Sequence, residues 1–511
     1  MLNKLGRDIP KHLKPFISAN DFKNHKRKLI AKKTKQSQTV FFESYEEVFD
    51  ALTIKAGDTM SFHHHLRNGD RVINDVCQVI KDKDIKDLHF APSSIFPSYD
   101  QMVDLIKTGH IIGIHTNYVN GPVARVISEG HLKEPLIMHT HGGRARAIES
   151  GDLKIDVAFI ACPSVDKSGN GSGAIGPNAC GTLGYAMADL YYAKKVILVT
   201  DNLVDTLEDY QLDGDYVDGV LLVDSIGDSE GIVSGTTKLT KDPVGLKIAS
   251  DCANMVNHLG LIHQDFSMQT GAGKTSLAVV SHIEKAMKAK NIQGGFASGG
   301  ITKAYVNMLE AGLFKNLYDV QCFDLDAVKS FAKNDNHLEM SASKYGNPFE
   351  EDIIADKLDF VVLGATEIDL DFNVNVSTDS MGYLIGGSGG HSDIAHGAKV
   401  TIVISPLIKS RTPIIKESVT TITTPGEDID IFISERGIAI NPKRQDLIDK
   451  LKHSGLYIYT MKDMLDMAHS MTGIPAKLKT DDQIVAYVEY RDGTIIDVIR
   501  KVHDDYIRKD T

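Results

Sequence analysis

The sequence lacks any long apolar segment and has few cysteines. No apolar run approaches the roughly 18 residues that a membrane-spanning helix requires. The N-terminus, MLNKLGRDIPKHLKPF, has neither the apolar stretch nor the small-residue cleavage site of a secretory signal. The five cysteines are scattered without a CxxC pair, which argues against a zinc site or a disulfide framework. We therefore expect a soluble cytoplasmic protein with reduced thiols and no contact with a membrane.

Short catalytic signatures are also missing. Gly273-Lys274-Thr275 ends like a phosphate-binding P-loop, but Met268 occupies the position of its first glycine. Without that glycine the loop loses the residue that tolerates its tight turn. The chain has no HExxH pattern, and nothing in it marks a Ser–His–Asp triad. The sequence therefore disfavours an ATP site, a metal centre and a nucleophilic serine.

Charge is distributed unevenly over the 511 residues, a length that suggests two to four domains. Residues 1–40 hold 11 Lys/Arg and 2 Asp/Glu, a charge of +9, so the remainder carries −12 − 9 = −21. The basic segment has few aromatic residues for stacking on bases, so we do not expect it to bind nucleic acid. We interpret 1–40 as a basic extension that crosses the acidic body or a subunit neighbour, with an acidic protein partner as the alternative.

The chain repeats itself at a nearly constant offset. DVAFIACPSVDKSGN at 156–170 resembles DFVVLGATEIDLDFN at 359–373, and AKKVILV at 193–199 resembles AKVTIVI at 398–404. Each half alternates short apolar β-rich runs with helical stretches, which is typical of sheets covered by helices on both faces. We predict two homologous α/β domains, over 41–240 and 245–511, with an active site between them at the carboxyl ends of the strands.

Two glycine-rich loops are candidate binding elements. Gly271-Ala272-Gly273 follows an apolar segment and precedes a helical run, so its N–H groups could hold a developing anion. GGSGG at 386–390 implies a close backbone approach, either to a ligand or to the facing domain. We expect the neighbouring His391 and His396 to pack or hydrogen-bond rather than to bind a metal.

Histidine-rich segments are the other candidates. In HHHLRN at 63–68, adjacent strand residues point to opposite faces, so three imidazoles would not converge on a metal. Arg67 is better suited to bind a carboxylate bidentately, and a structural strand-to-turn cap is the alternative. The HTHGGR segment at 139–144 is a weaker signal, because a helix-starting turn with Arg144 or Arg146 paired to an acid explains it equally well.

Several of these motifs resemble those of known acyl-transfer proteins. VDKSGN at 165–170, the GxG at 271–273 and GGHSDIAHGAK at 389–399 resemble family-I CoA-transferases. FHHHLRNGD, FSMQTGAG and ISERGIAINPKR resemble, more closely, the citrate lyase α subunit family. The resemblance covers nearly all of the chain past residue 40, and it implies two CoA-transferase-like α/β domains.

The resemblance to that family also implies a reaction and partners. Acetyl-[acyl carrier protein] and citrate would give citryl-[acyl carrier protein] and acetate, as in a citrate CoA-transferase of the citrate (pro-3S)-lyase complex in citrate fermentation. A β subunit would cleave the citryl thioester, and a γ subunit would carry the acyl group on a CoA-like arm. Acetyl-CoA could replace that carrier, and the chain itself, an expected oligomer, would bind no cofactor.

One departure from the CoA-transferases narrows this expectation. They carry S-E-N-G with a nucleophilic glutamate, whereas ASGG at 297–300 places Ser298 at that position. A serine without an adjacent base is a poor substitute for a carboxylate. We therefore predict that a citrate carboxylate attacks the acetyl thioester directly, unless Glu230, Glu367 or Glu435 replaces the missing group.

The resulting assignments divide the candidate residues into three groups. Gly271, Ala272 and Gly273 would stabilise the oxyanion, and citrate would bind to His63, His65, Arg67 and Asn68. Gly386, Gly387, Ser388, Gly389 and Gly390 would hold the CoA-like arm. The alternatives are the corresponding subunit of malonate decarboxylase, an acetyl-CoA hydrolase, or a ligand-sensing regulator, although residues 1–40 show no helix-turn-helix.

Overall fold

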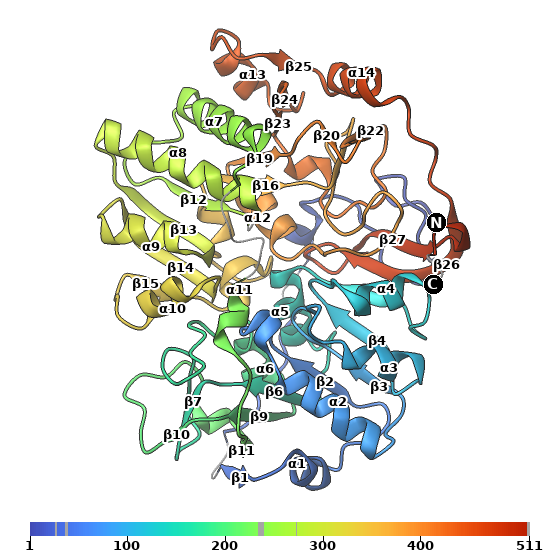
Figure 1. Cartoon of the computed structure of the whole chain (residues 1–511), viewed down its shortest axis with the longest axis vertical. Coiled ribbons are helices and arrows are strands. Elements are labelled where there is room, and N and C mark those ends of the chain that lie inside the picture. Colours follow the sequence, from blue (N-terminus) through green and yellow to red (C-terminus); the bar gives the residue numbers. More distant parts are fainter. Residues whose placement is uncertain (26–27, 36–38, 234–239, 272, 508–511) are drawn as a thin grey trace.

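The computed structural model in Figure 1 describes residues 1–25, 28–35, 39–233, 240–271 and 273–507. Ala272 and the segments 234–239, 26–27, 36–38 and 508–511 lie outside the described residues. Over the described ranges, no helix is both long enough and apolar enough to cross a bilayer.

A ten-stranded sheet forms the core of the first half. Its order is β1-β11-β9-β6-β2-β3-β4-β5-β26-β27. Its strands are β1 (Val40–Phe42), β2 (Thr59–Phe62), β3 (Leu88–Phe90), β4 (Ile111–Thr116), β5 (Leu136–Met138), β6 (Val157–Ala161), β9 (Lys195–Thr200), β11 (Gly219–Leu222), β26 (Thr480–Glu489) and β27 (Ile495–Val502). The helices of this half are α1 (Tyr45–Leu52), α2 (Val72–Asp82), α3 (Gln101–Lys107), α4 (Pro122–Ser128), α5 (His141–Ser150) and α6 (Met187–Tyr192).

A nine-stranded sheet in the order β15-β14-β13-β12-β16-β19-β23-β24-β25 forms the core of the second half. Its strands are β12 (Ser267–Thr270), β13 (Gly294–Ile301), β14 (Phe314–Cys322), β15 (His337–Glu339), β16 (Phe360–Gly364), β19 (Val400–Ile404), β23 (Ile431–Ser434), β24 (Gly437–Ile440) and β25 (Ile458–Tyr459). The accompanying helices are α7 (Pro243–His258), α8 (Lys274–Lys290), α9 (Lys303–Glu310), α10 (Leu325–Phe331), α11 (Ala342–Gly346), α12 (His391–Gly397), α13 (Gln445–Leu451) and α14 (Met461–Thr472).

Smaller sheets complete each half. The first half has a three-stranded sheet of β7 (Ser164–Asp166), β8 (Gly171–Ser172) and β10 (Leu203–Val204). The second half has β17 (Glu367–Asp369), β18 (Val374–Asn375) and β22 (Ile415–Lys416), together with the pair β20 (Ile408–Lys409) and β21 (Thr412–Pro413). The two three-stranded sheets occur at the two copies of the sequence repeat.

The predicted internal duplication is confirmed by the strand order. Seven neighbouring strands of the first sheet, β11-β9-β6-β2-β3-β4-β5, match β23-β19-β16-β12-β13-β14-β15 of the second. Every pairing within these two sets is parallel. β6 and β19 are buried along their whole length, as expected of apolar strands covered on both faces. The fold is therefore a duplicated α/β architecture.

The C-terminal hairpin does not follow the order of the chain. β26 pairs in parallel with β5, so β26 and β27 extend the first sheet although residues 480–502 come last in the sequence. Figure 1 shows these red strands beside the blue and cyan first half. The division of the chain at residues 240 and 245 stays a prediction. Residues 480–502, which were expected in the second domain, extend the sheet of the first half.

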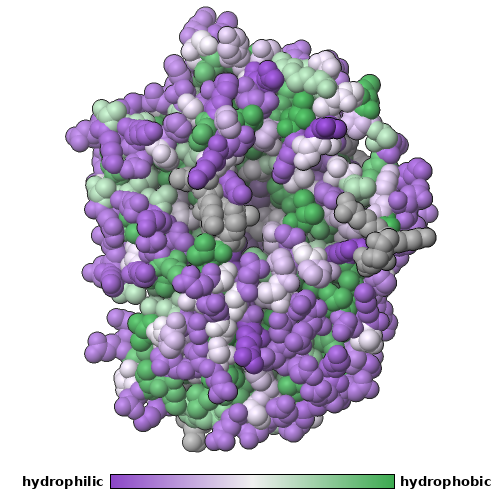
Figure 2. Space-filling view, in the orientation of Figure 1, coloured by the Kyte–Doolittle hydropathy of each residue, from purple (hydrophilic) through white to green (hydrophobic). Residues whose placement is uncertain are grey.

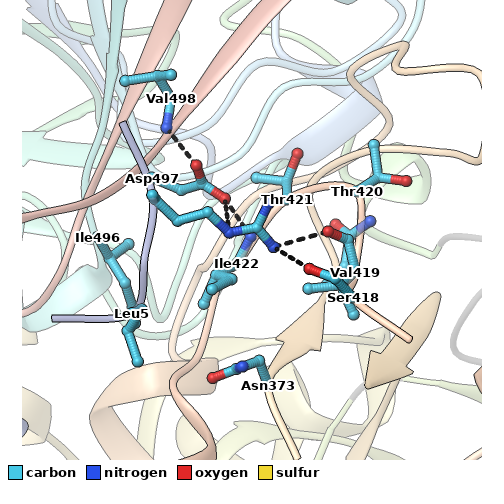
Figure 3. Close-up of polar contacts among 12 residues, drawn as sticks. Leu5, Asn373, Ser418, Val419, Thr420, Thr421, Ile422, Ile496, Asp497 and Val498 are labelled. Atoms are coloured by element: carbon cyan, nitrogen blue, oxygen red, sulfur yellow. Dashed lines mark hydrogen bonds and ion pairs between the residues drawn. The ribbon is translucent and has the colours of Figure 1, made fainter. Parts of the chain in front are cut away.

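The basic N-terminal segment contacts acidic residues of the body of the chain. Arg7 lies 3.4 Å from Asp497 of β27 and donates to the Val419 carbonyl at 2.7 Å. Figure 3 shows Asp497 also accepting hydrogen bonds from the backbone of Ile422 and Val498. Further along, Lys33 pairs with Asp218. The segment therefore contacts the C-terminal hairpin and residues of both halves of the chain.

Candidate functional site

The loops that follow the parallel strands of both sheets meet between the two halves. Gln321 of β14 donates from Nε2 to the His64 carbonyl at 2.7 Å. The His141 N–H donates to the Gly389 carbonyl at 2.8 Å, and the Gly389 N–H donates to the Asn117 carbonyl at 3.1 Å. In Figure 2 the surface is hollowed near the middle of the view, at the level where the halves meet. The candidate site lies at this junction.

Glycines of the 386–390 loop lie against the facing half at Gly387 and against their own half at Gly390. A Cβ on Gly387 would overlap the Asn117 carbonyl, and a Cβ on Gly390 would overlap the hydroxyl of Tyr345. Ser388 is buried and its hydroxyl lies 3.1 Å from that of Ser392 on α12. Of the two alternatives that the sequence left open, the structure therefore shows close approach to the facing domain. The assignment of this loop to a CoA-like arm stays a prediction.

Ser298 lies in a buried chain of hydrogen bonds. Its hydroxyl donates to Gln269 Oε1 at 2.9 Å, and Gln269 Nε2 donates to the Tyr345 hydroxyl at 2.9 Å. All three side chains are at least 95 % buried, with exposed fractions of 1 %, 5 % and 2 %. Among the described residues no basic group hydrogen-bonds to the serine hydroxyl, so the arrangement does not activate it as a nucleophile.

The predicted oxyanion loop is only partly available. The Gly271 N–H donates to the Val362 carbonyl at 2.8 Å, so it is not free for a substrate oxygen. Ala272 lies outside the described residues. Gly273 is exposed and is the N-cap of α8, a 17-residue helix whose first N–H groups point outward. The donors left at this loop are therefore Gly273 and the first turn of α8.

The three consecutive histidines are buried, but they do not converge on a common ion. The His63 and His65 rings stack with centroids 5.8 Å apart. His63 Nε2 lies 3.4 Å from Asp189, which is also paired with Arg144. Burial lowers the pKa of His63 to about 4, although Asp189 opposes the shift, and it lowers the pKa of His65 well below its usual value. Both imidazoles are therefore neutral at pH 7.

Arg67 lies between aromatic rings from both halves. Its guanidinium carbon is 5.0 Å from the ring centre of Phe96 and 4.7 Å from that of Phe323. Arg67 is 8 % exposed, whereas Asn68 is exposed. Arg67 has a left-handed φ of 51° at the start of the 3₁₀ helix Arg67–Gly69, which carries Asn68 to the surface. The structure therefore does not bring Asn68 into the buried group that includes His63, His65 and Arg67.

His141 is a member of the site to which the sequence gave little weight. Its Nδ1 accepts from Asn117 Nδ2 at 2.9 Å, and its ring centroid is 4.7 Å from that of Tyr185 and 6.1 Å from that of Tyr345. Burial, with a smaller contribution from Arg144, lowers the pKa of His141 to about 3. Asn117, Tyr185 and Tyr345 carried no sequence signal because they lie in separate segments of the chain, two loops and α11, and join the site only through the fold.

Other charged residues near these motifs have structural partners. Arg144 donates to Asp189 at 3.0 Å and Arg146 to Asp152 at 2.8 Å, so the pairing of these arginines with acids is confirmed. His391 bonds to the Thr424 hydroxyl and the Gly364 carbonyl. His396 lies 2.9 Å from Asp428, so both histidines hydrogen-bond as predicted.

The three glutamates considered as replacements have different surroundings. Glu367 is 2 % exposed and accepts hydrogen bonds from Thr420 and Asn375, so it is committed to the small sheet of β17. Glu435 accepts from the Leu407 N–H at 3.0 Å and faces Arg436. Glu230 is exposed in the 3₁₀ helix Ser229–Ile232. None of the three hydrogen-bonds to Ser298, Gln269 or Tyr345 among the contacts of the described residues.

One group of side chains has the spacing of metal ligands. Ligand atoms of Asp319, Cys322 and His337 lie within 4.8 Å of one another among the described residues. The carboxylate accepts from Cys322 Sγ and contacts His337 Nε2, each at 3.0 Å, and His337 Nδ1 lies 3.1 Å from Ser330 Oγ. Because these atoms are already paired with one another, we interpret them as a hydrogen-bonded core. All five cysteines are free and buried.

Comparison with known proteins gives one consistent result. The family described as citrate lyase, alpha subunit (CitF), matches residues 38–502. The chain is 42 % identical over 475 residues to the citrate lyase alpha chain of Klebsiella pneumoniae, with 93 % of each chain covered. It is 41 % identical over 460 residues to the corresponding chain of Escherichia coli, with 90 % of each covered.

Solved structures agree with these relatives. The alpha subunit of citrate lyase from Streptococcus mutans, determined in complex with citrate, is similar with a TM-score of 0.92 and 41 % identity, covering 98 % of this chain and 100 % of that one. A malonate decarboxylase alpha subunit from Acinetobacter baumannii has a TM-score of 0.63 at 15 % identity, covering 86 % and 93 % of the two chains. This second likeness concerns the fold alone.

Proposed function

Because the chain belongs to the citrate lyase α subunit family, we propose that it transfers the acyl carrier of an acetyl thioester to citrate. Acetyl-[acyl carrier protein] and citrate give citryl-[acyl carrier protein] and acetate, with acetyl-CoA as a substitute donor. The citrate-bound relative from Streptococcus mutans supports citrate as the acceptor. Ser298, hydrogen-bonded to Gln269 at the position of the usual glutamate, is the observation that carries the proposed mechanism.

Direct attack accounts for the missing nucleophile. A citrate carboxylate oxygen bonds to the acetyl carbonyl carbon, the C–S bond breaks, and a thiolate and an acetyl–citrate anhydride form. The thiolate then attacks the citryl carbonyl carbon of the anhydride. The bond between that carbon and the bridging oxygen breaks, and acetate leaves with this oxygen. No net proton or electron is transferred. The protein needs only to orient the reactants and to stabilise each oxyanion.

Citrate is expected at the junction that contains Arg67. Three carboxylates need cationic or N–H partners when they leave water. Arg67 is a permanent cation between two aromatic rings at the junction, and His63 and His65 lie on the same loop. The exposed Asn68 contributes less to this proposal. Gly273 and the start of α8 would serve the oxyanion at the second half.

The CoA-like arm and the partner subunits are also proposals. The 386–390 loop lies beside Asn117 and His141, so an arm passing along it would reach the junction. We propose that the carrier γ subunit presents this arm and that the β subunit receives the citryl thioester. The chain itself would work in the cytoplasm as part of an oligomeric complex without a bound cofactor.

The test is a substrate comparison with the purified chain. Acetyl-CoA and citrate should give citryl-CoA and acetate, measured by mass spectrometry of the thioester pool. Malonate in place of citrate should give less than a tenth of that rate. A chain that uses malonate at least as well as citrate would instead act like the malonate decarboxylase subunit, and thioester loss without an acceptor would indicate a hydrolase.

A further inference from the structure

His141 lies where three parts of the proposed site meet. On one side its ring centroid is 6.5 Å from that of His64, in the loop that carries Arg67. On another it contacts the ring of Tyr345, whose hydroxyl accepts from Gln269 in the Ser298 chain. Its Nε2 lies 3.4 Å from the point that a Cβ on Gly389 would occupy. The imidazole therefore borders the loops from both halves.

Asn117 determines which nitrogen of His141 carries the proton. The Asn117 side-chain N–H donates to Nδ1, so in the neutral ring the hydrogen is on Nε2. Nε2 has no hydrogen-bond partner among the described residues, and the side chain is partly exposed. An N–H donor thus points into the space that Gly389, lacking a side chain, leaves open.

The surroundings of His141 keep the ring neutral. Arg144 follows it by one turn of α5 and is itself paired with Asp189. His141 is the first residue of α5, where the positive end of the helix dipole disfavours a protonated imidazole. Asp393 accepts from the Gly142 N–H at 2.8 Å and faces Arg491, while His64, Tyr185 and Tyr345 are uncharged neighbours. A neutral imidazole can donate a hydrogen bond without giving up its proton.

We propose that His141 donates its Nε2–H to the thioester carbonyl oxygen as that oxygen becomes an oxyanion. The inference rests on the proposed acyl exchange and adds a catalytic residue to it. His141 provides a further donor at the junction, whereas the Gly271 N–H of the predicted loop is held by Val362. The proton stays on Nε2 throughout, so the hydrogen bond strengthens on attack and relaxes when the C–S or C–O bond breaks.

The first experiment removes and then restores the donor. His141→Ala should lower kcat by roughly 100-fold or more, the usual effect of losing one oxyanion donor, while both KM values change less than about threefold. In His141→Gln the amide N–H can replace the imidazole N–H, so kcat should be at least about tenfold higher than in His141→Ala. His131→Ala, on an exposed histidine elsewhere in the first half, is the matched control and should leave kcat unchanged.

The second experiment changes the tautomer without removing the ring. Asn117→Asp has the same shape, but its carboxylate accepts a hydrogen bond from Nδ1. The neutral ring then carries its hydrogen on Nδ1, and Nε2 has none to donate. Asn117 is fully buried, so the new carboxylate should lower the melting temperature, and in the fraction that is folded by circular dichroism kcat should fall about as much as in His141→Ala. Wild-type kcat should show no inflection attributable to His141 between pH 5.5 and 8, because the imidazole is already neutral there.

Each outcome decides a specific point. If the wild-type chain makes no citryl thioester, the proposed function fails. If the wild-type chain is active and His141→Ala retains more than about a third of kcat, only the role of His141 fails. Wild-type activity in Asn117→Asp would contradict the assignment of the His141 hydrogen to Nε2. A loss of kcat below about pH 7 that disappears in His141→Gln would make His141 a base instead of a donor.

Discussion

The Ser298 hydroxyl donates to Gln269 Oε1 over 2.9 Å, and this contact occupies the serine that replaces the usual glutamate. Gln269 is in turn held by Tyr345 at 2.9 Å. Because the hydroxyl has an acceptor and no base, its expected role is structural. The arrangement leaves the nucleophilic role to the substrate.

Ser298→Ala should therefore retain activity. The change removes one buried hydrogen bond, which costs about 1 kcal/mol of stability, and kcat for citryl-CoA formation should stay within about threefold of wild type. Steady-state kinetics and thermal unfolding of the same preparation test both parts. A fall of more than about 100-fold in kcat without a change in melting temperature would make Ser298 a nucleophile and contradict the mechanism.

Arg67→Ala should raise the KM for citrate far more than the KM for acetyl-CoA. The permanent cation between Phe96 and Phe323 is expected to pair with a citrate carboxylate. Its removal should therefore raise the KM for citrate by about tenfold or more. Arg71→Ala, which breaks an exposed pair with Asp75 four residues further along, is the control and should leave both KM values unchanged. An unchanged citrate KM in Arg67→Ala would exclude this role.

Arg491→Met should destabilise the protein more at high pH. Arg491 Nε lies 3.6 Å from Asp393, and both side chains are fully buried. Burial raises the pKa of Asp393 to about 6 while Arg491 opposes the shift. The unfolded carboxyl loses its proton at a lower pH than the folded one, so stability falls as pH rises from about 4 to 6. Without the guanidinium the pKa of folded Asp393 is higher still, so the pH range over which stability falls extends to higher pH.

The loss in Arg491→Met should therefore be larger at pH 7.5, up to about 3–5 kcal/mol, than at pH 5, where Asp393 is mostly protonated. Melting temperatures of variant and wild type at the two pH values provide the measurement. Lys247→Met, which removes an exposed pair with Asp251, should change the melting temperature little at either pH. An equal loss at pH 5 and 7.5 would mean that Asp393 does not titrate between them.

The sequence predicted the local elements and their repetition better than the contacts between them. The apolar runs that form β6 and β16 and the near-constant offset were enough to predict two homologous α/β units. The pairing of β26 with β5 joins segments about 350 residues apart, and no local pattern encodes such a pairing. For that reason the C-terminal hairpin was expected in the other domain.

The site shows the same limit. Arg67 and Ser298 were identified from motifs because their neighbours in the chain are distinctive. Tyr345 of α11 and Asn117 of the loop after β4 join the site only because these segments meet at the junction of the halves. The glycines at 387 and 390 indicated a close approach, and the structure shows Asn117 of the facing half at Gly387 and Tyr345 of the same half at Gly390. Only the folded chain could distinguish that role from ligand binding.

The most direct test of direct attack is a single turnover with ¹⁸O-labelled citrate carboxylates and acetyl-CoA, at enzyme in excess over thioester. Attack by citrate leaves one citrate oxygen in the released acetate, so the acetate should gain one ¹⁸O, measured by mass spectrometry. A covalent glutamyl mechanism would instead release unlabelled acetate and leave ¹⁸O in one carboxylate of the protein. Labelled acetate from an unlabelled chain is the predicted result, and unlabelled acetate with a labelled glutamate would contradict it.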